Sequence, residues 1–133
     1  MMLDFRNIQF HEKEPVYIQI VKYLKRAIYL GDVQNGETLP SRREIAAQLK
    51  INPNTAQKAF RLMEEEQLIQ TPKNAASIIQ YTQSTLQQIQ KEMTDDMIRS
   101  FVAMAKQNRL TLEEVQEDIQ RIWAEDDTKK QIE

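Results

Sequence analysis

The chain has 133 residues, no cysteine and only two glycines, which favours one mainly helical domain, or one small domain plus an appendage, and excludes disulfides and zinc–thiolate sites. No run of the sequence approaches the length of a membrane span and no secretory leader is recognisable, so we expect a cytoplasmic protein with no membrane partner. The formal net charge is −2, but residues 1–80 hold 11 Lys and Arg against 9 Asp and Glu (net +2), whereas residues 81–133 hold 7 against 11 (net −4), so a nucleic-acid surface is expected in the first part.

The N-terminal part begins with an arm and a helix. Residues 1–13 contain apolar side chains without a helix start, and we interpret them as an arm that packs elsewhere, for instance on a second subunit. Pro15 then opens a helix to about Leu30, because apolar residues recur at three- and four-residue spacing and Gly31 is a natural C-cap. The following residues 32–39 are expected to form a loop with room for a very short strand.

Two short helical patterns with separate start signals follow. Ser41 and Glu44 have the spacing of a capping box, which predicts a helix over 41–49. Asn52-Pro53 places an N-cap residue before a proline at the first helical position, which predicts a second helix over 52–66. Only a few residues remain for the turn, so the two helices must cross steeply, as in a helix-turn-helix whose second helix enters the DNA major groove.

Two short strands are predicted directly after this pair of helices. Residues 68–71 and 77–81 are rich in isoleucine and flank the turn Pro72-Lys73-Asn74-Ala75, in which Asn74 can adopt a left-handed conformation. A two-stranded hairpin after a recognition helix makes a winged helix-turn-helix, which we assign to residues 14–81. The acidic run Glu64-Glu65-Glu66 before the hairpin is interpreted as a solvated helix end.

The C-terminal part reads as two helices, over 82–107 and 111–125, followed by a polar, frayed tail over 126–133. Thr111 and Glu114 have the spacing of a second capping box. Two such helices cannot bury their apolar faces alone, so we interpret 82–125 as a homodimerisation region. Its expected contact residues are Leu86, Ile89, Met93, Met97, Phe101, Met104, Ile119 and Trp123. A pocket for an unknown small-molecule effector on the methionine-rich stripe is the alternative.

The spaced motifs of residues 14–81 resemble the N-terminal domain of GntR-family bacterial transcription regulators. They are Pro15-Val16-Tyr17-Ile18-Gln19-Ile20, Gly31, Gly36, Leu39-Pro40-Ser41-Arg42-Arg43, Thr55-Ala56, Ala59-Phe60 and Met63-Glu64. The short C-terminal part and the start Asn52-Pro53-Asn54-Thr55 are similar to the YtrA subfamily. The resemblance implies a homodimeric DNA-binding regulator, usually a repressor, often of transporter or cell-envelope operons.

The resemblance also implies DNA-contacting positions. The family's Pro-Ser-x-Arg motif matches Ser41 and Arg43, and the polar start of its recognition helix matches Asn52, Asn54 and Thr55. The family usually has glycine where this chain has Gln67, and its wing tip carries glycines where residues 73–77 here have none. We therefore expect the wing to contribute less than in relatives.

Further DNA contacts are predicted from the side chains themselves, because arginine and lysine neutralise phosphates and amides pair with adenine edges. An ordinary solvated helix face is the alternative for the second helix. Arg42 and Arg43 could instead form a surface pair held by Glu44, and Thr55 could stabilise the helix start internally. The expected DNA-binding set is Ser41, Arg42, Arg43, Asn52, Asn54, Thr55, Gln57, Lys58, Arg61 and Lys73.

Catalytic and cofactor chemistry is not expected. The sequence has one histidine, His11, and no nucleophile–base pair, phosphate-binding glycine loop or metal-ligand spacing, so we expect no enzyme, cofactor or metal. We therefore predict a transcriptional regulator, a repressor by resemblance, that binds a pseudo-palindromic double-stranded operator as a homodimer. The alternative is a protein-interaction or sensory winged-helix module that has lost DNA binding.

Overall fold

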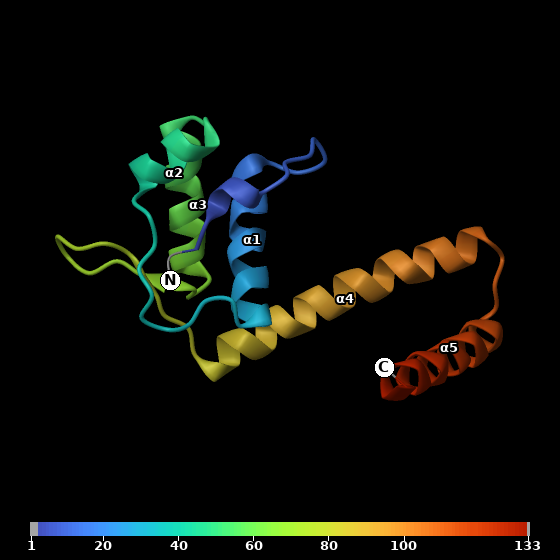
Figure 1. Ribbon diagram of the computed structural model, residues 1–133. Coiled ribbons are helices and arrows are strands. Elements are labelled where there is room, and N and C mark those ends of the chain that lie inside the picture. Colours follow the sequence, from blue (N-terminus) through green and yellow to red (C-terminus); the bar gives the residue numbers. More distant parts are fainter. Residues whose placement is uncertain (1–2, 133) are drawn as a thin grey trace. The chain divides into compact units, whose positions relative to one another are not determined.

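The computed structural model describes residues 3–132, and helices dominate it (Figure 1). The order is η1 (Phe5–Asn7), α1 (Val16–Leu30), α2 (Arg42–Leu49), α3 (Pro53–Glu65), β1 (Ile69–Gln70), β2 (Ile78–Ile79), α4 (Gln83–Gln107) and α5 (Leu112–Ile132). The chain divides into two compact units at Lys91, within α4. The predicted fold class, a mainly helical winged helix-turn-helix, is confirmed. None of the helices over residues 3–132 combines the length and apolarity that a membrane span requires.

The first unit has a three-helix core with α3 in contact with both α1 and α2. The apolar positions predicted at helical spacing supply its interior, and Ile20, Leu24, Ile45, Phe60 and Met63 are all at most 1% exposed. Each such side chain contributes roughly 1.5–3 kcal/mol relative to an exposed one. This packing fixes the crossing of α2 and α3 and so determines which face of α3 remains outside.

The start signals of α2 and α3 form as the sequence predicts. Ser41 Oγ accepts from the Glu44 backbone N–H at 3.0 Å, and Glu44 Oε1 accepts from the Ser41 N–H at 3.4 Å, completing the capping box. Lys50 ends α2 in the left-handed conformation with φ 55°. Asn52 Oδ1 accepts from the Asn54 N–H at 2.8 Å, with Pro53 at the first helical position of α3. The turn between the helices is therefore three residues long, 50–52.

The wing is smaller than predicted. β1 and β2 pair antiparallel through only two residue pairs, Ile69 with Ile79 and Gln70 with Ile78. Thr38 adds an isolated bridge to Ile78, so the 32–39 loop pairs with β2 at one residue instead of forming the very short strand for which the sequence left room. The predicted strands 68–71 and 77–81 are too long. Toward the tip, the wing loop spreads from its base and leaves Thr71 and Ser77 outside the ladder (Figure 1), and at the body end one further bond joins the Gln80 N–H to the Leu68 carbonyl.

Two non-glycine residues around the wing have positive φ. Asn74, at the tip, has φ 60°, as the sequence predicts for an asparagine in that turn. Gln67, between α3 and β1, has φ 62°, although glutamine rarely adopts this conformation. Gln67 is the position at which the family usually has glycine, so the backbone requirement is kept here at some cost in strain.

The N-terminal arm differs from the prediction, with residues 1–2 outside the described part. Asp4 caps the short helix η1 and accepts from the Arg6 side chain, which holds the pKa of the Asp4 carboxyl below its usual value. Phe5 is fully buried, with its ring centroid 5.6 Å from that of Tyr23, whose hydroxyl donates to the Asp4 carbonyl. The expectation of no helix start is wrong, and Phe5 packs on its own chain rather than on a second subunit.

The second unit contains the end of α4 and all of α5. The predicted second capping box forms, since Thr111 Oγ1 accepts from the Glu114 N–H at 3.2 Å and Glu114 Oε1 from the Thr111 N–H at 3.1 Å. The predicted frayed tail is wrong for residues 126–132, which continue α5. Lys129 and Lys130 lie in its last turn, where positive charge stabilises a helix end. Glu133 lies outside the described residues.

Candidate nucleic-acid interface

The outward face of α3 is polar and accessible. Its buried side is set by Ala56, Ala59, Phe60 and Met63, so the residues between them must point outward at helical spacing. Asn54, Gln57, Lys58 and Arg61 are exposed, and Thr55 is half-buried. Amide and guanidinium groups on one exposed helix face present the donors and acceptors that pair with base edges.

Two of the predicted contact residues on this helix have contacts within the chain. Asn52 uses its side-chain oxygen as the N-cap of α3, which leaves its amide NH₂ for other partners. The Lys58 ammonium lies 6.0 Å from the centroid of the Tyr17 ring, at the outer limit of a cation–π contact. Both remain exposed to solvent.

The start of α2 presents Arg43 to solvent. Arg43 is exposed, and it has no ion-pair partner among residues 3–132. It follows Ser41 and Arg42 at the positive end of the α2 dipole, where free backbone N–H groups favour an anion. This placement suits contact with a phosphate oxygen.

Glu44 does not hold Arg42 or Arg43, as the alternative interpretation of the sequence had it, and Arg42 has other partners. Its Nη2 donates to Glu64 Oε1 at 3.0 Å, and its guanidinium carbon lies 4.8 Å from the centroid of the Phe60 ring. Glu44 is engaged instead with the Ser41 backbone. Arg42 therefore connects α2 to α3 within the protein.

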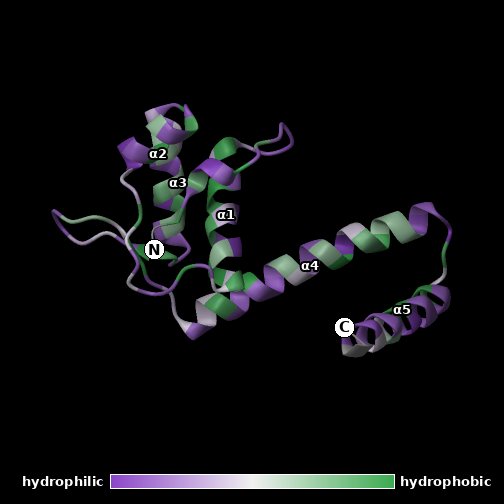
Figure 2. Cartoon of the chain, in the orientation of Figure 1, coloured by the Kyte–Doolittle hydropathy of each residue, from purple (hydrophilic) through white to green (hydrophobic). Residues whose placement is uncertain are grey.

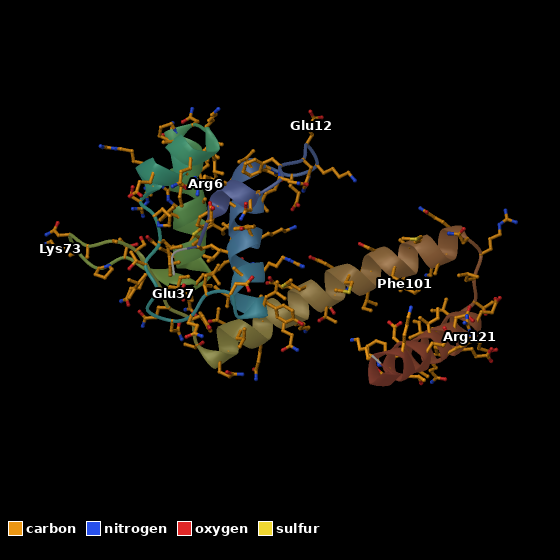
Figure 3. The ribbon with its side chains drawn as sticks, in the orientation of Figure 1. Arg6, Glu12, Glu37, Lys73, Phe101 and Arg121 are labelled. Carbon is orange, nitrogen blue, oxygen red and sulfur yellow. The ribbon has the colours of Figure 1, made fainter. Side chains whose placement is uncertain are left out.

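The wing completes this side of the unit. Lys73 is exposed at its tip and extends away from the helices (Figure 3). A hollow of about 370 Å³ separates the wing from the start of α2. It is lined by Ser41, Arg42, Arg43, Phe60, Thr71, Ala75, Ala76 and Ser77. The hydroxyl and guanidinium groups around this hollow can donate hydrogen bonds to an anionic group bound in it.

Glu64, Thr71 and Ser77 were missed as members of this surface. The acidic run was expected to be solvated, but Glu64 binds Arg42 and accepts from the Thr71 hydroxyl, and Glu66 pairs with Lys25 at 2.9 Å. A signal existed in the helical spacing, because Glu64 follows Phe60 by four residues and so shares its face. The involvement of Thr71 and Ser77 depends on tertiary packing and has no local signal.

The predicted dimerisation residues fall into two groups. Ile89 is 2% exposed and Leu86 half-buried, and both lie before the division at Lys91, with the first unit. Met93 and the others lie in the second unit, where Met93 is half-buried and the remaining residues have much of their apolar surface exposed. These are Met97, Phe101, Met104, Ile119 and Trp123.

The second unit also has an apolar groove of about 560 Å³. Its walls are Met97, Ile98 and Phe101 from α4 and Ile119, Ile122 and Trp123 from α5, with Asp126, Asp127 and Lys130 at one end. Hydrophobic residues recur along α4 in Figure 2. An exposed apolar surface of this kind marks an interaction site in a soluble protein.

Metal chemistry has no support in this part of the chain. Within residues 3–132, no group of three or more His, Cys, Asp or Glu side chains is placed to hold a metal ion.

The chain is similar to known bacterial regulators. Residues 16–79 match the model of the bacterial regulatory proteins of the gntR family. The uncharacterised HTH-type transcriptional regulator YhcF of Bacillus subtilis is 31% identical over 84% of this chain and 92% of that protein. The HTH-type transcriptional repressor YtrA of the same organism is 30% identical over 84% of this chain and 86% of that protein. The crystal structure of a transcriptional regulator from Oenococcus oeni superposes with a TM-score of 0.72 at 28% identity, over 90% of this chain and 99% of that one.

Proposed function

Because the chain belongs to the GntR family of bacterial regulatory proteins and is a DNA-binding transcriptional regulator, we propose that it represses transcription by binding a pseudo-palindromic operator as a homodimer. The observation that carries the DNA part is the exposed polar face of α3, presented beside the exposed Arg43 at the start of α2. The apolar surface of the second unit supports the homodimer.

Each part of the interface has a distinct contact in this proposal. Asn54, Gln57 and Arg61 on α3 meet base edges in the major groove and carry sequence specificity. Arg43 and Lys73 meet phosphates, which position the protein and supply affinity without selecting a sequence. Phosphate contacts release counterions, so affinity is expected to fall steeply with salt.

The homodimer follows from what the second unit leaves exposed. Trp123 is 70% exposed and Met97 68%, both in the groove between α4 and α5. We assign this groove to a second copy rather than to an effector, because the exposed apolar residues extend beyond it to Met104 and Leu112. A two-fold dimer requires a two-fold operator, with half-sites about one helical turn apart or a multiple of it.

Repression is proposed from the relative that carries that description. The repressor YtrA of Bacillus subtilis matches over most of both chains, 84% of this one and 86% of that one. A dimer that covers promoter DNA blocks polymerase by occupancy, and this requires no additional domain. A reporter gene fused to the promoter of the protein's own operon should therefore become more active when the gene for this protein is deleted.

Binding is tested on the same promoter. Fluorescence anisotropy with a labelled promoter fragment should give saturable binding that weakens as salt rises, and unrelated DNA of equal length should bind far more weakly. Equal affinity for both fragments, or no binding to either, would favour the interaction or sensory module instead. Lower promoter activity after deletion would contradict repression.

A further inference from the structure

A chain of polar contacts joins α2, α3 and the base of the wing. Arg42 Nη2 donates to Glu64 Oε1 at 3.0 Å, and the Thr71 hydroxyl donates to the same oxygen at 2.9 Å. Thr71 Oγ1 lies 2.7 Å from Ser77 Oγ. Thr71 directly follows β1 and Ser77 directly precedes β2, so the chain spans both sides of the wing where it leaves the body.

The Arg42 side chain is committed to this network. Its guanidinium packs over Phe60, its Nε is shielded from solvent, and the side chain is 35% exposed. The neighbouring Arg43 is exposed and unpaired among residues 3–132. The two arginines therefore stand in different physical situations, although the sequence places them side by side.

Outside this network, contacts from the loop before α2 hold the β2 side of the wing, where Thr38 bridges Ile78 and the Ile79 backbone bonds with Gly36 and Glu37. The ladder of the wing consists of two residue pairs, and the loop 71–77 lacks the glycines that would let its backbone approach DNA closely. Ser77 is 6% exposed, and its carbonyl accepts from the Leu39 N–H at 2.9 Å, which fixes the β2 side. On the β1 side, Thr71 is held through Glu64 and Ser77. The position of the tip therefore depends on the contacts at its base.

We infer that Arg42 is a positioning residue: with Glu64 it holds the base of the wing against α3 and so sets where Lys73 meets the DNA backbone. Arg42 acts on affinity through the wing, and Arg43 acts by direct contact. The inference concerning DNA affinity rests on the proposed function, whereas the effect on the wing exists in the free protein.

Removing the Glu64 carboxylate distinguishes a positioning role of Arg42 from a direct phosphate contact, because the two predict opposite changes in promoter affinity. If Glu64 holds the wing through Arg42 and Thr71, Glu64→Ala weakens promoter binding roughly three- to tenfold despite removing a negative charge. If Arg42 instead contacts phosphate, Glu64→Ala frees it and tightens binding. Glu65→Ala is the matched control, because Glu65 is exposed and unpaired in residues 3–132, and its loss should leave affinity equal or slightly higher.

Arg42→Lys provides a second test that keeps the charge. Lysine cannot reproduce the planar guanidinium that packs over Phe60 while it bonds Glu64. If Arg42 positions the wing, Arg42→Lys should therefore lose nearly as much promoter affinity as Arg42→Ala. If Arg42 contacts a phosphate, Arg42→Lys keeps the charge and should bind the promoter with nearly the affinity of the parent chain. In a Lys73→Ala background, Arg42→Ala should cost less than about twofold further, because both changes act through the same tip; multiplicative losses would overturn the inference.

Amide hydrogen exchange of the DNA-free protein completes the experiment. Arg42→Ala and Glu64→Ala should speed exchange in the wing, residues 69–79, while Arg43→Ala and Glu65→Ala leave it unchanged. Unchanged wing exchange in both former variants would overturn the inference even if promoter binding fell. Faster wing exchange without any promoter binding by the parent chain would support the wing contact and contradict the proposed function instead.

Discussion

The two units use the same kinds of apolar side chain and treat them in opposite ways. Phe60 and Met63 in the first unit are at most 1% exposed, whereas Met97 and Trp123 in the second are about two-thirds exposed. Both sets recur at helical spacing in the sequence. The first unit therefore buries these apolar side chains within one chain, whereas the second unit leaves them exposed to contact another surface.

The difference shows what a helical apolar stripe can and cannot indicate. Spacing predicts that a face will be buried but not whether its partner belongs to the same chain. In the first unit α3 has both α1 and α2 against it, and the wing follows at its end. The second unit has only α5 and the end of α4, which are too few to cover one another. A second copy is the surface we propose for them.

The largest expected effect is on the completed core. Phe60→Ala should lower the free energy of unfolding by about 3–5 kcal/mol, because it removes a buried aromatic ring and leaves a cavity. Chemical denaturation followed by circular dichroism measures this. Phe10→Ala, which truncates a 37% exposed ring in the same unit, should cost less than about 1 kcal/mol. Equal losses for both would contradict the contrast in burial.

The next largest effect is expected from changing the exposed apolar residues of the second unit. The double variant Met97→Glu/Trp123→Glu should dissociate the dimer, because carboxylates in an apolar interface are desolvated without partners. Promoter affinity should then fall about 100-fold or more as two-site binding is lost, with the helical content of each chain kept. Sedimentation velocity and anisotropy report both. Gln116→Glu/Gln120→Glu adds the same two negative charges at exposed polar sites of α5 and should leave the dimer intact.

A smaller effect tests the exposed polar surface of the first unit. Arg43→Ala should weaken promoter binding about tenfold and lower the salt slope by about 1, with unchanged stability, because it removes one phosphate contact. The matched variant Arg26→Ala removes the same charge from an exposed position of α1. If Arg26→Ala weakened binding as much as Arg43→Ala, long-range charge rather than contact would explain the loss.

The smallest effect concerns the strained turn before the wing. Gln67→Gly should raise the free energy of unfolding by about 0.5–1 kcal/mol, because glycine adopts φ 62° without a Cβ clash. Asn74→Gly should raise the free energy of unfolding less, since asparagine tolerates the left-handed conformation better than glutamine does. Thermal unfolding compares the two. A loss of stability in Gln67→Gly would show that the turn holds its shape without strain.

Local signals explain most of what the sequence predicted correctly. Capping boxes at Ser41 and Thr111, the Asn52-Pro53 start and the asparagine turn at Asn74 each involve residues at most three apart, and each forms. The helical spacing of apolar residues correctly predicted the buried side of α3, and hence its exposed polar face.

The remainder depended on contacts between distant residues. Phe5 meets Tyr23 18 positions away, and Arg42 meets Glu64 22 positions away, so neither pairing has a local pattern. The continuation of α5 through Asp126 and Asp127 has no apolar stripe to mark it, so the sequence predicts a frayed tail where the helix continues. Charged residues form stable helices when opposite charges suit the helix ends, as Glu113 and Lys130 do here.

The mass of the protein–promoter complex tests the central claim most directly. Analytical ultracentrifugation of the full chain with a fragment of its own promoter should give a complex of two chains per operator, formed cooperatively. The same measurement on Met97→Glu/Trp123→Glu should give no stable complex at the same concentration. A tight complex containing a single chain would contradict the account, because the exposed apolar surface of the second unit would then not be completed by a second copy.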